Sequence, residues 1–129
     1  MSHLFQPHLT SQNIKSLSPS ALAYVGDAVF ELWVRSQLLL PARKIHDFHL
    51  EVVSQVKAEA QALLAQKMTP VLSEDEQEIF RRARNSASGK PKRVPLQIYQ
   101  QATGFEAVLG YLYLTNQSRL EEILDMMRD

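Results

Sequence analysis

The sequence predicts a single all-α domain of five to seven helices, and two observations support this prediction. Apolar residues recur with a helical period through most of the chain, and no segment shows the sustained alternation that is typical of a strand. Residues that favour helix starts stand before the apolar segments, and prolines fall mostly at the boundaries between them. A length of 129 residues fits one domain over residues 1–129.

Two long segments in the first half of the chain are predicted to be helices. Residues 17–41 open with Ser18 and Pro19, which are favoured at a helix start, and then run with a helical period to the proline that ends them. Residues 45–68 place apolar side chains near one face among alanines and charges, which predicts one amphipathic helix. Asp47 is the expected N-cap of this helix.

The second half of the chain is predicted to contain three more helices and one loop. A Ser-x-x-Glu capping box begins at Ser73 and predicts a helix start. Residues 86–95, with one glycine and two prolines, predict a loop. Residues 96–116 are apolar and predict the next helix, and residues 118–129 open with a second capping box at Ser118.

The composition excludes several classes of protein. Basic and acidic residues number 14 each, so the chain is not a polycation that binds nucleic acid by bulk charge. The absence of cysteine excludes a disulfide scaffold and a zinc–thiolate site. No apolar run approaches the roughly 18 residues of a membrane span, and the first residues lack the pattern of a signal peptide. A cytoplasmic protein with no membrane contact is therefore expected.

Two carboxylates interrupt apolar helical segments. Asp27 follows Gly26 within ALAYVGDAVFELW, and Glu106 lies between Thr103 and Gly110 within TGFEAVLGYLYL. An unpaired carboxylate in apolar surroundings costs several kcal/mol unless it is compensated. Small residues beside each acid would let the two helices approach closely, and a divalent cation between the carboxylates would offset the cost of burial. Oxygen ligands without cysteine favour Mg²⁺, with Mn²⁺ as the alternative.

Other interpretations of these acids stay open at this stage. Each acid alone could be a solvent-facing carboxylate or one partner of a buried ion pair. Glu31, four residues after Asp27, is placed to share a metal site, but Arg35 follows after four more residues. An ordinary ion pair on the helix surface between Glu31 and Arg35 is therefore favoured.

Positive charge is concentrated in one stretch, although the total charge is zero. Residues 81–93, RRARNSASGKPKR, contain six basic residues and no acid. The stretch spans a helix end and a loop, so its long side chains are placed to contact the phosphates of a duplex. It contains no aromatic residue, so stacking on single-stranded bases is not indicated. The alternative is a solvated loop with arginines at a helix end.

The segments around both acids resemble those of a known family. LAYVGDAVFEL resembles the signature helix of ribonuclease III endonuclease domains, and TGFEAVLGYLYL resembles the second acidic helix of that family. HLEVVSQVKAEAQALL and RARNS lie between them, and this order resembles most closely the short branch, Mini-ribonuclease III, which lacks the double-stranded-RNA-binding domain. These motifs span about residues 17–114.

The resemblance implies an all-α endonuclease domain that works as a homodimer. Two metal-dependent sites would cut both strands of an RNA duplex and leave 5′-phosphate and 3′-hydroxyl ends. Asp27 stands at the family's catalytic aspartate and Glu106 at its metal-binding glutamate. The expected substrate of the short branch is precursor large-subunit (23S) ribosomal RNA in bacteria or plastids. Ala23 and Thr103 replace two further acids of the longer ribonucleases, so fewer carboxylates are available per site.

The resulting hypothesis is metal-assisted hydrolysis of double-stranded RNA. Asp27 and Glu106 are expected to hold the metal ion. The residues expected to contact the duplex are Arg84, Asn85, Lys90, Lys92 and Arg93. Two other functions stay as alternatives: a non-catalytic RNA-binding or ribosome-associated protein with the same fold, and a helical protein-interaction module whose acids are structural.

Overall fold

The computed structural model describes residues 9–87 and 93–128. Within these ranges the chain forms seven α-helices, one 3₁₀ turn and no strand, which confirms the all-α class expected from the sequence. The elements are α1 (Ser11–Lys15), α2 (Pro19–Gln37), α3 (Ile45–Val56), α4 (Ala58–Met68), η1 (Thr69–Val71), α5 (Glu74–Ser86), α6 (Leu96–Thr115) and α7 (Gln117–Met127).

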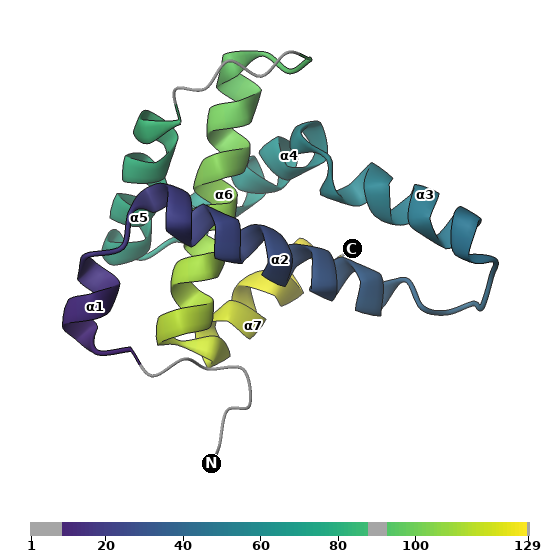
Figure 1. The fold of residues 1–129 in the computed structure, drawn as a ribbon, viewed down its shortest axis with the longest axis horizontal. Helices are drawn as coiled ribbons and strands as arrows, with labels where there is room; N and C mark the ends of the chain where they lie inside the picture. The colour runs from purple at the N-terminus through teal and green to yellow at the C-terminus, as the bar shows by residue number, and fades with distance from the viewer. Residues whose placement is uncertain (1–8, 88–92, 129) are drawn as a thin grey trace.

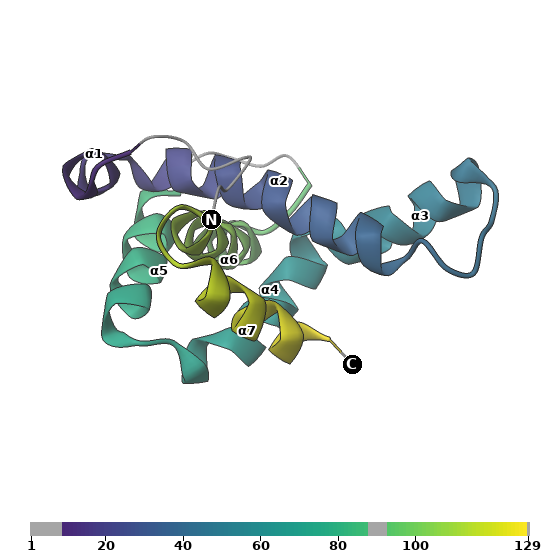
Figure 2. The same cartoon turned by 90° about the horizontal axis from the view of Figure 1, so that it is seen from below.

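Helix α6 forms the centre of the domain. Figure 2 shows it end-on, with α2 lying across it above, α5 to the left, α4 to the right and α7 below. Ten residues of α6 are buried. Most of this helix is therefore surrounded by other parts of the domain. Phe105 of α6 meets Phe30 of α2 edge to face, with ring centroids 5.0 Å apart, and both side chains are buried. This contact helps to fix α2 across α6.

The structure confirms the helix starts that were predicted at Ser18 and Ser73. The backbone nitrogen of Ala21 donates to Oγ of Ser18 at 3.0 Å, and Pro19 is the first residue of α2. Ser73 and Glu76 form a reciprocal capping box, in which the backbone nitrogen of Ser73 donates to Oε1 of Glu76 at 2.8 Å. These contacts satisfy backbone donors that have no partner within the helix.

The segment expected to be one helix over residues 45–68 is two helices. Lys57 separates α3 from α4, and its φ of −67° and ψ of 158° are extended. Helix α3 buries only Val52, whereas α4 buries four side chains, so the two halves pack against different surroundings. Asp47 is not the N-cap of α3, because Lys44 holds that position and Asp47 lies in the first turn. The prediction of one continuous helix was wrong.

The start of the described chain and the end of α2 also differ from the prediction. The short helix α1 was not expected, and it begins with a capping box at Thr10. Helix α2 ends at Gln37 rather than near Pro41, and its C-cap is Leu38. Within residues 9–87 and 93–128, every helix is too short or too polar to span a lipid bilayer.

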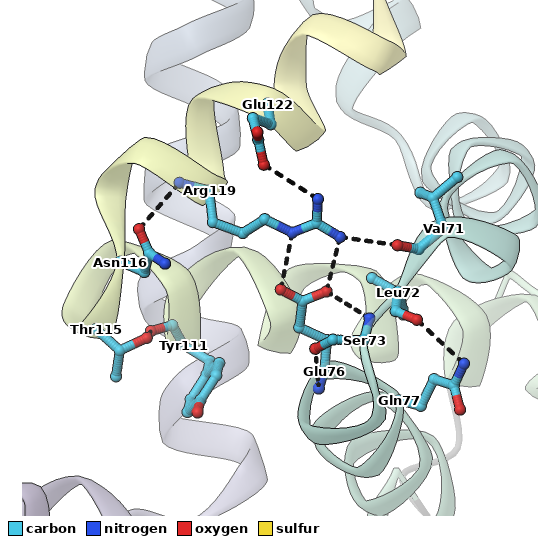
Figure 3. Close-up of polar contacts among 10 residues, drawn as sticks. All are labelled: Val71, Leu72, Ser73, Glu76, Gln77, Tyr111, Thr115, Asn116, Arg119 and Glu122. Atoms are coloured by element: carbon cyan, nitrogen blue, oxygen red, sulfur yellow. Dashed lines mark hydrogen bonds and ion pairs between the residues drawn. The ribbon is translucent and has the colours of Figure 1, made fainter.

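Helix α7 begins two residues before the expected capping box. Its N-cap is Asn116 rather than Ser118, and Oδ1 of Asn116 accepts from the backbone nitrogen of Arg119 at 3.1 Å. The Arg119 guanidinium lies over the start of α5 and donates to both carboxylate oxygens of Glu76, at 2.9 and 3.0 Å (Figure 3). It also donates to the backbone oxygen of Val71 at 2.8 Å. This bidentate pair ties α7 to the start of α5.

Helix α3 projects from the domain beside the end of α2, as Figures 1 and 2 show. We call residues 32–56 the arm. Large apolar side chains of the arm are exposed: Leu32, Leu39, Leu40, Ile45, Leu50 and Val53. A cleft of about 470 Å³ lies at its base, and Phe30, Trp33 and Leu63 are among the residues that line it. Exposed apolar surface of this kind is typical of a protein–protein contact.

Candidate active site

Helices α2 and α6 cross with their backbones in direct contact, and a glycine on each helix permits this contact. A Cβ atom on Gly26 would lie 1.7 Å from the carbonyl oxygen of Glu106, and one on Gly110 would lie 2.0 Å from the carbonyl oxygen of Leu22. No side chain fits at either position unless the helices separate. The close approach that the small residues predicted is therefore confirmed at these two glycines.

The crossing brings Asp27 of α2 together with Glu106 of α6. Their carboxyl groups are within hydrogen-bonding reach of each other. Burial raises the pKa of Glu106 from its ordinary 4.5 to about 8, and the hydrogen bond and negative charge of Asp27 act in the same direction. Glu106 therefore holds a proton at neutral pH in the metal-free chain.

The surroundings of Asp27 differ from the apolar environment that was predicted. Asp27 is exposed, whereas Glu106 is partly enclosed. Tyr24, one turn before Asp27, is 82% exposed, and Ala28 is also exposed. Tyr24 and Ala28 therefore point outward, whereas Ala23 and Phe30 on the flanking side of the helix are buried. The acidic pair lies at the surface, where a large substrate can reach it.

The chemistry of the pair suits a hard divalent cation. Two facing carboxylates offer oxygen ligands, which Mg²⁺ and Mn²⁺ prefer. The described residues contain no group of three or more His, Cys, Asp or Glu side chains placed to hold a metal ion. Glu31 bonds to Arg35 at 3.1 Å, which is the ion pair favoured from the sequence. A cation held by Asp27 and Glu106 would keep several water ligands, as Mg²⁺ usually does.

A third side chain at the site, Gln61 of α4, was not expected from the sequence. It is 2% exposed, and its Nε2 donates to the backbone oxygen of Val56 at 2.9 Å. The amide also forms a hydrogen bond with Glu106, which lowers the pKa of Glu106 and offsets part of the effect of burial. In the sequence, Gln61 is marked only as a polar residue between two alanines, which is a weak signal on an amphipathic helix.

The described residues that were expected to contact RNA lie at the end of α5 and just before α6. Arg84 is half-buried in the last turn of α5, and its Nε donates to Oδ1 of the exposed Asn85 at 3.3 Å. Arg93 is exposed just before α6 begins. Lys90 and Lys92 lie outside the described residues. The acid of α6 comes ten residues after the start of that helix, a rise of about 15 Å. The structure therefore does not place Arg93 beside the acidic pair.

Known proteins share both the sequence and the fold. The ribonuclease III domain matches residues 20–117. A Mini-ribonuclease 3 of Thermosynechococcus vestitus is 51% identical over 111 residues, which cover 86% of this chain and 74% of that protein. A Mini-ribonuclease 3 of Thermoanaerobacter sp. is 46% identical over 121 residues, which cover 92% and 85%. A crystal structure of a protein from Fusobacterium nucleatum has a TM-score of 0.82 at 30% identity, with 89% of this chain and 96% of that chain covered.

These matches define a class, the all-α endoribonuclease domain of the ribonuclease III type. The chain belongs to the ribonuclease III family and, within it, to the Mini-ribonuclease 3 branch. The resemblance seen in the sequence is thereby confirmed. Enzymes of this family generally depend on divalent metal ions, act on double-stranded RNA and form dimers.

Proposed function

We propose that the chain is a metal-dependent endoribonuclease that cleaves double-stranded RNA and leaves 5′-phosphate and 3′-hydroxyl ends. Its proposed role is the maturation of precursor 23S ribosomal RNA in the cytoplasm, with residues 1–129 as one catalytic domain. The observation that carries the proposal is the Asp27–Glu106 pair. Glu106 keeps its proton at neutral pH because its side chain is largely removed from solvent and also faces another acid, so a cation is the natural partner for the ionised pair.

Asp27 and Glu106 would hold Mg²⁺, with Mn²⁺ as the alternative ion. The ion would supply an activated water and would neutralise charge that develops on the phosphate. Glu106 must lose its proton before it can act as a ligand, whereas the exposed Asp27 would be the carboxylate open to an RNA backbone. The close contact between Gly26 and α6 would hold the two carboxylates near one another, so that the site is organised before RNA binds.

The residues proposed to hold the duplex are Arg84, Asn85, Lys90, Lys92 and Arg93. Arg84 bonds to a neutral amide rather than to an acid, so its positive charge is available to a phosphate. Arg84→Ala and Arg93→Ala should each lower the slope of log affinity against log salt by about 1. Arg81→Ala is the matched control, because Glu78 lies 2.6 Å from Arg81 and offsets its charge. An unchanged slope would remove these residues from the RNA interface.

The arm is the proposed binding surface for a second copy of the chain. Leu32 is 66% exposed, Ile45 76% and Leu40 80%, which is a large apolar surface for a small domain. Homodimerisation would cover this surface and would place two acidic pairs in one particle. This arrangement is what cleavage of both strands of a duplex needs.

Cleavage of a fully paired RNA in Mg²⁺ tests the proposed activity. Asp27→Asn and Glu106→Gln should lower cleavage by more than about 100-fold, because loss of even an outer-shell partner typically costs 10–100-fold. Glu31→Gln is the control, since this neighbouring acid is paired with Arg35. Undiminished cleavage by Asp27→Asn would overturn the assignment of the site.

The same experiment separates the alternatives. RNA binding without cleavage by the wild-type chain would support a non-catalytic RNA-binding protein, and no RNA affinity in Ca²⁺ would support a protein-interaction module. Sequencing the ends produced from total precursor RNA tests the substrate. Cuts at the ends of the 23S segment are expected, and their absence would leave a duplex-specific nuclease with another substrate.

A further inference from the structure

Gln61 is a buried polar residue on an otherwise apolar surface of α4. The other buried residues of this helix are Ala62, Ala65 and Met68, and Gln61 itself is 2% exposed. An amide that leaves water must recover its hydrogen bonds, and an apolar side chain of the same length would fit here without that cost. The presence of an amide at this position must therefore be explained by the hydrogen bonds that the amide makes.

The amide nitrogen of Gln61 contacts two separate parts of the fold. It donates to the backbone oxygen of Val56, the last residue of α3, at 2.9 Å. The same amide group bonds to the carboxyl group of Glu106 in the middle of α6. An amide nitrogen carries two N–H donors, so one Gln61 side chain can serve both acceptors. A reversed amide would set its oxygen against the carbonyl oxygen of Val56, so this acceptor fixes the orientation.

The amide oxygen shows that stability alone does not account for this arrangement. Oε1 of Gln61 is buried and has no hydrogen-bond partner among the described residues. A buried acceptor without a hydrogen bond lowers the stability of a fold. A residue that is retained at a cost to stability is typical of a functional site.

We propose that Gln61 is a positioning residue, which holds the Glu106 carboxylate in place for the divalent cation and joins it to the corner between α3 and α4. This proposal rests on the function proposed above. At the corner, the extended Lys57 is the only residue between the two helices. A movement of α3 would shift the Val56 carbonyl, and the shared amide would pass that shift to Glu106. The arm and the acidic pair are thus linked through one side chain.

Gln61→Met tests the proposal, because methionine has a similar length and removes both hydrogen bonds. Gln66→Met is the matched control, since Gln66 is an exposed residue of the same helix. Four quantities are measured: the Mn²⁺ affinity by electron paramagnetic resonance without RNA, kcat and KM on a fully paired RNA in saturating Mg²⁺, and the melting temperature.

The loss expected in Gln61→Met is about 10-fold in Mn²⁺ affinity and about 10-fold in kcat, as for other partners of metal ligands. KM for RNA should stay within about twofold, because the RNA contacts are intact. The melting temperature should stay close to that of the wild type, because removal of the unpartnered amide oxygen offsets the loss of the two hydrogen bonds. Gln66→Met should leave all four quantities unchanged.

Wild-type Mn²⁺ affinity and kcat in Gln61→Met would overturn the proposal, while cleavage by the wild-type chain would leave the proposed function standing. A lower melting temperature with unchanged Mn²⁺ affinity would show a purely structural residue and would also overturn it. Gln61→Leu replaces the methionine variant if that variant does not fold, with the same outcomes. A wild-type chain that neither binds Mn²⁺ nor cleaves RNA would overturn the proposed function, and this inference with it.

Discussion

Replacing Glu106 with glutamine should stabilise the metal-free protein at pH 8. The pKa of Glu106 is about 8 in the folded chain, against an ordinary 4.5, because the side chain is buried and faces Asp27. The folded state therefore binds the Glu106 proton more tightly than the unfolded state does. The contribution of this proton to stability is fully present below pH 4.5 and is lost as the pH rises to about 8. Glutamine keeps the shape of the side chain and removes this loss.

The change in pKa sets the size of the effect. A rise from 4.5 to about 8 corresponds to a ceiling of roughly 5 kcal/mol lost by pH 8. Glu106 is only partly enclosed and Asp27 is exposed, so solvent screening reduces the expected loss to about 2 kcal/mol. For a domain of this length, about 2 kcal/mol corresponds to a difference of about 8 °C in melting temperature.

Thermal unfolding followed by circular dichroism in EDTA measures this difference. The melting temperature of Glu106→Gln should match that of the wild type near pH 4.5 and exceed it increasingly up to pH 8. Glu31→Gln should show no such trend, because Glu31 is a surface acid paired with Arg35. Mg²⁺ should raise the melting temperature of the wild type at pH 8 more than that of Glu106→Gln. A difference between the two proteins that does not change with pH would refute the reasoning.

Three further perturbations test the rest of the fold. Gly26→Ala puts a Cβ 1.7 Å from the carbonyl oxygen of Glu106, so α2 and α6 must separate. Urea denaturation should show a loss of about 2 kcal/mol in the free energy of unfolding, and RNA cleavage should fall with it. Wild-type values of both quantities would contradict the contact. Burial raises the pKa of Glu76, but Arg119 outweighs burial and the pKa lies below 4.5, so the stability from this pair is present above pH 4.5 and is lost on acidification. Arg119→Met should therefore cost about 2 kcal/mol at neutral pH and less in acid, and an equal loss at both pH values would argue against the ion pair. Ile45→Asp should convert a dimer into a monomer in sedimentation velocity, and an unchanged dimer would exclude this part of the arm from the interface.

Helix starts could be predicted because capping acts over three residues of chain. Ser18 and Ser73 each accept a hydrogen bond from the backbone nitrogen three residues later. The break at Lys57 could not be predicted in this way, because residues 45–68 contain no glycine or proline and keep their apolar spacing across it. The break arises because α3 packs little against the domain and α4 packs closely, which is a property of the tertiary structure.

The start of α7 shows a similar limit of local patterns. Asn116 and Ser118 are both good N-cap residues, so the sequence alone does not choose between them. When α7 starts at Asn116, Arg119 lies in its first turn and bonds to Glu76, which is 43 residues away in the chain. A contact between residues so far apart has no signature in the local sequence.

The acidic pair was predictable because carboxylates break the pattern of apolar helices. Asp27 and Glu106 each stand beside a small residue, and the glycines indicate where the helices approach. The exposure of Asp27 was not predictable, since apolar neighbours such as Tyr24 can face solvent. Gln61 was missed because a single glutamine on an amphipathic helix is typical of a polar face, and only the fold shows that this face meets α6.

The proton on Glu106 makes metal binding and RNA binding depend on each other, if the proposed function holds. Without a cation, the exposed Asp27 repels a phosphate at the site, and Glu106 cannot act as a ligand until its proton leaves. Metal affinity should therefore rise with pH up to about 8. A bound divalent ion neutralises two carboxylates, so a phosphate can approach the pair only after the ion has bound. The basic stretch of residues 81–93 carries its charge at every physiological pH, so contact with the RNA backbone there needs no metal. Under the proposed function, a chain with a net charge of zero would hold a duplex through its basic stretch and would select the metal-loaded state through its acidic pair.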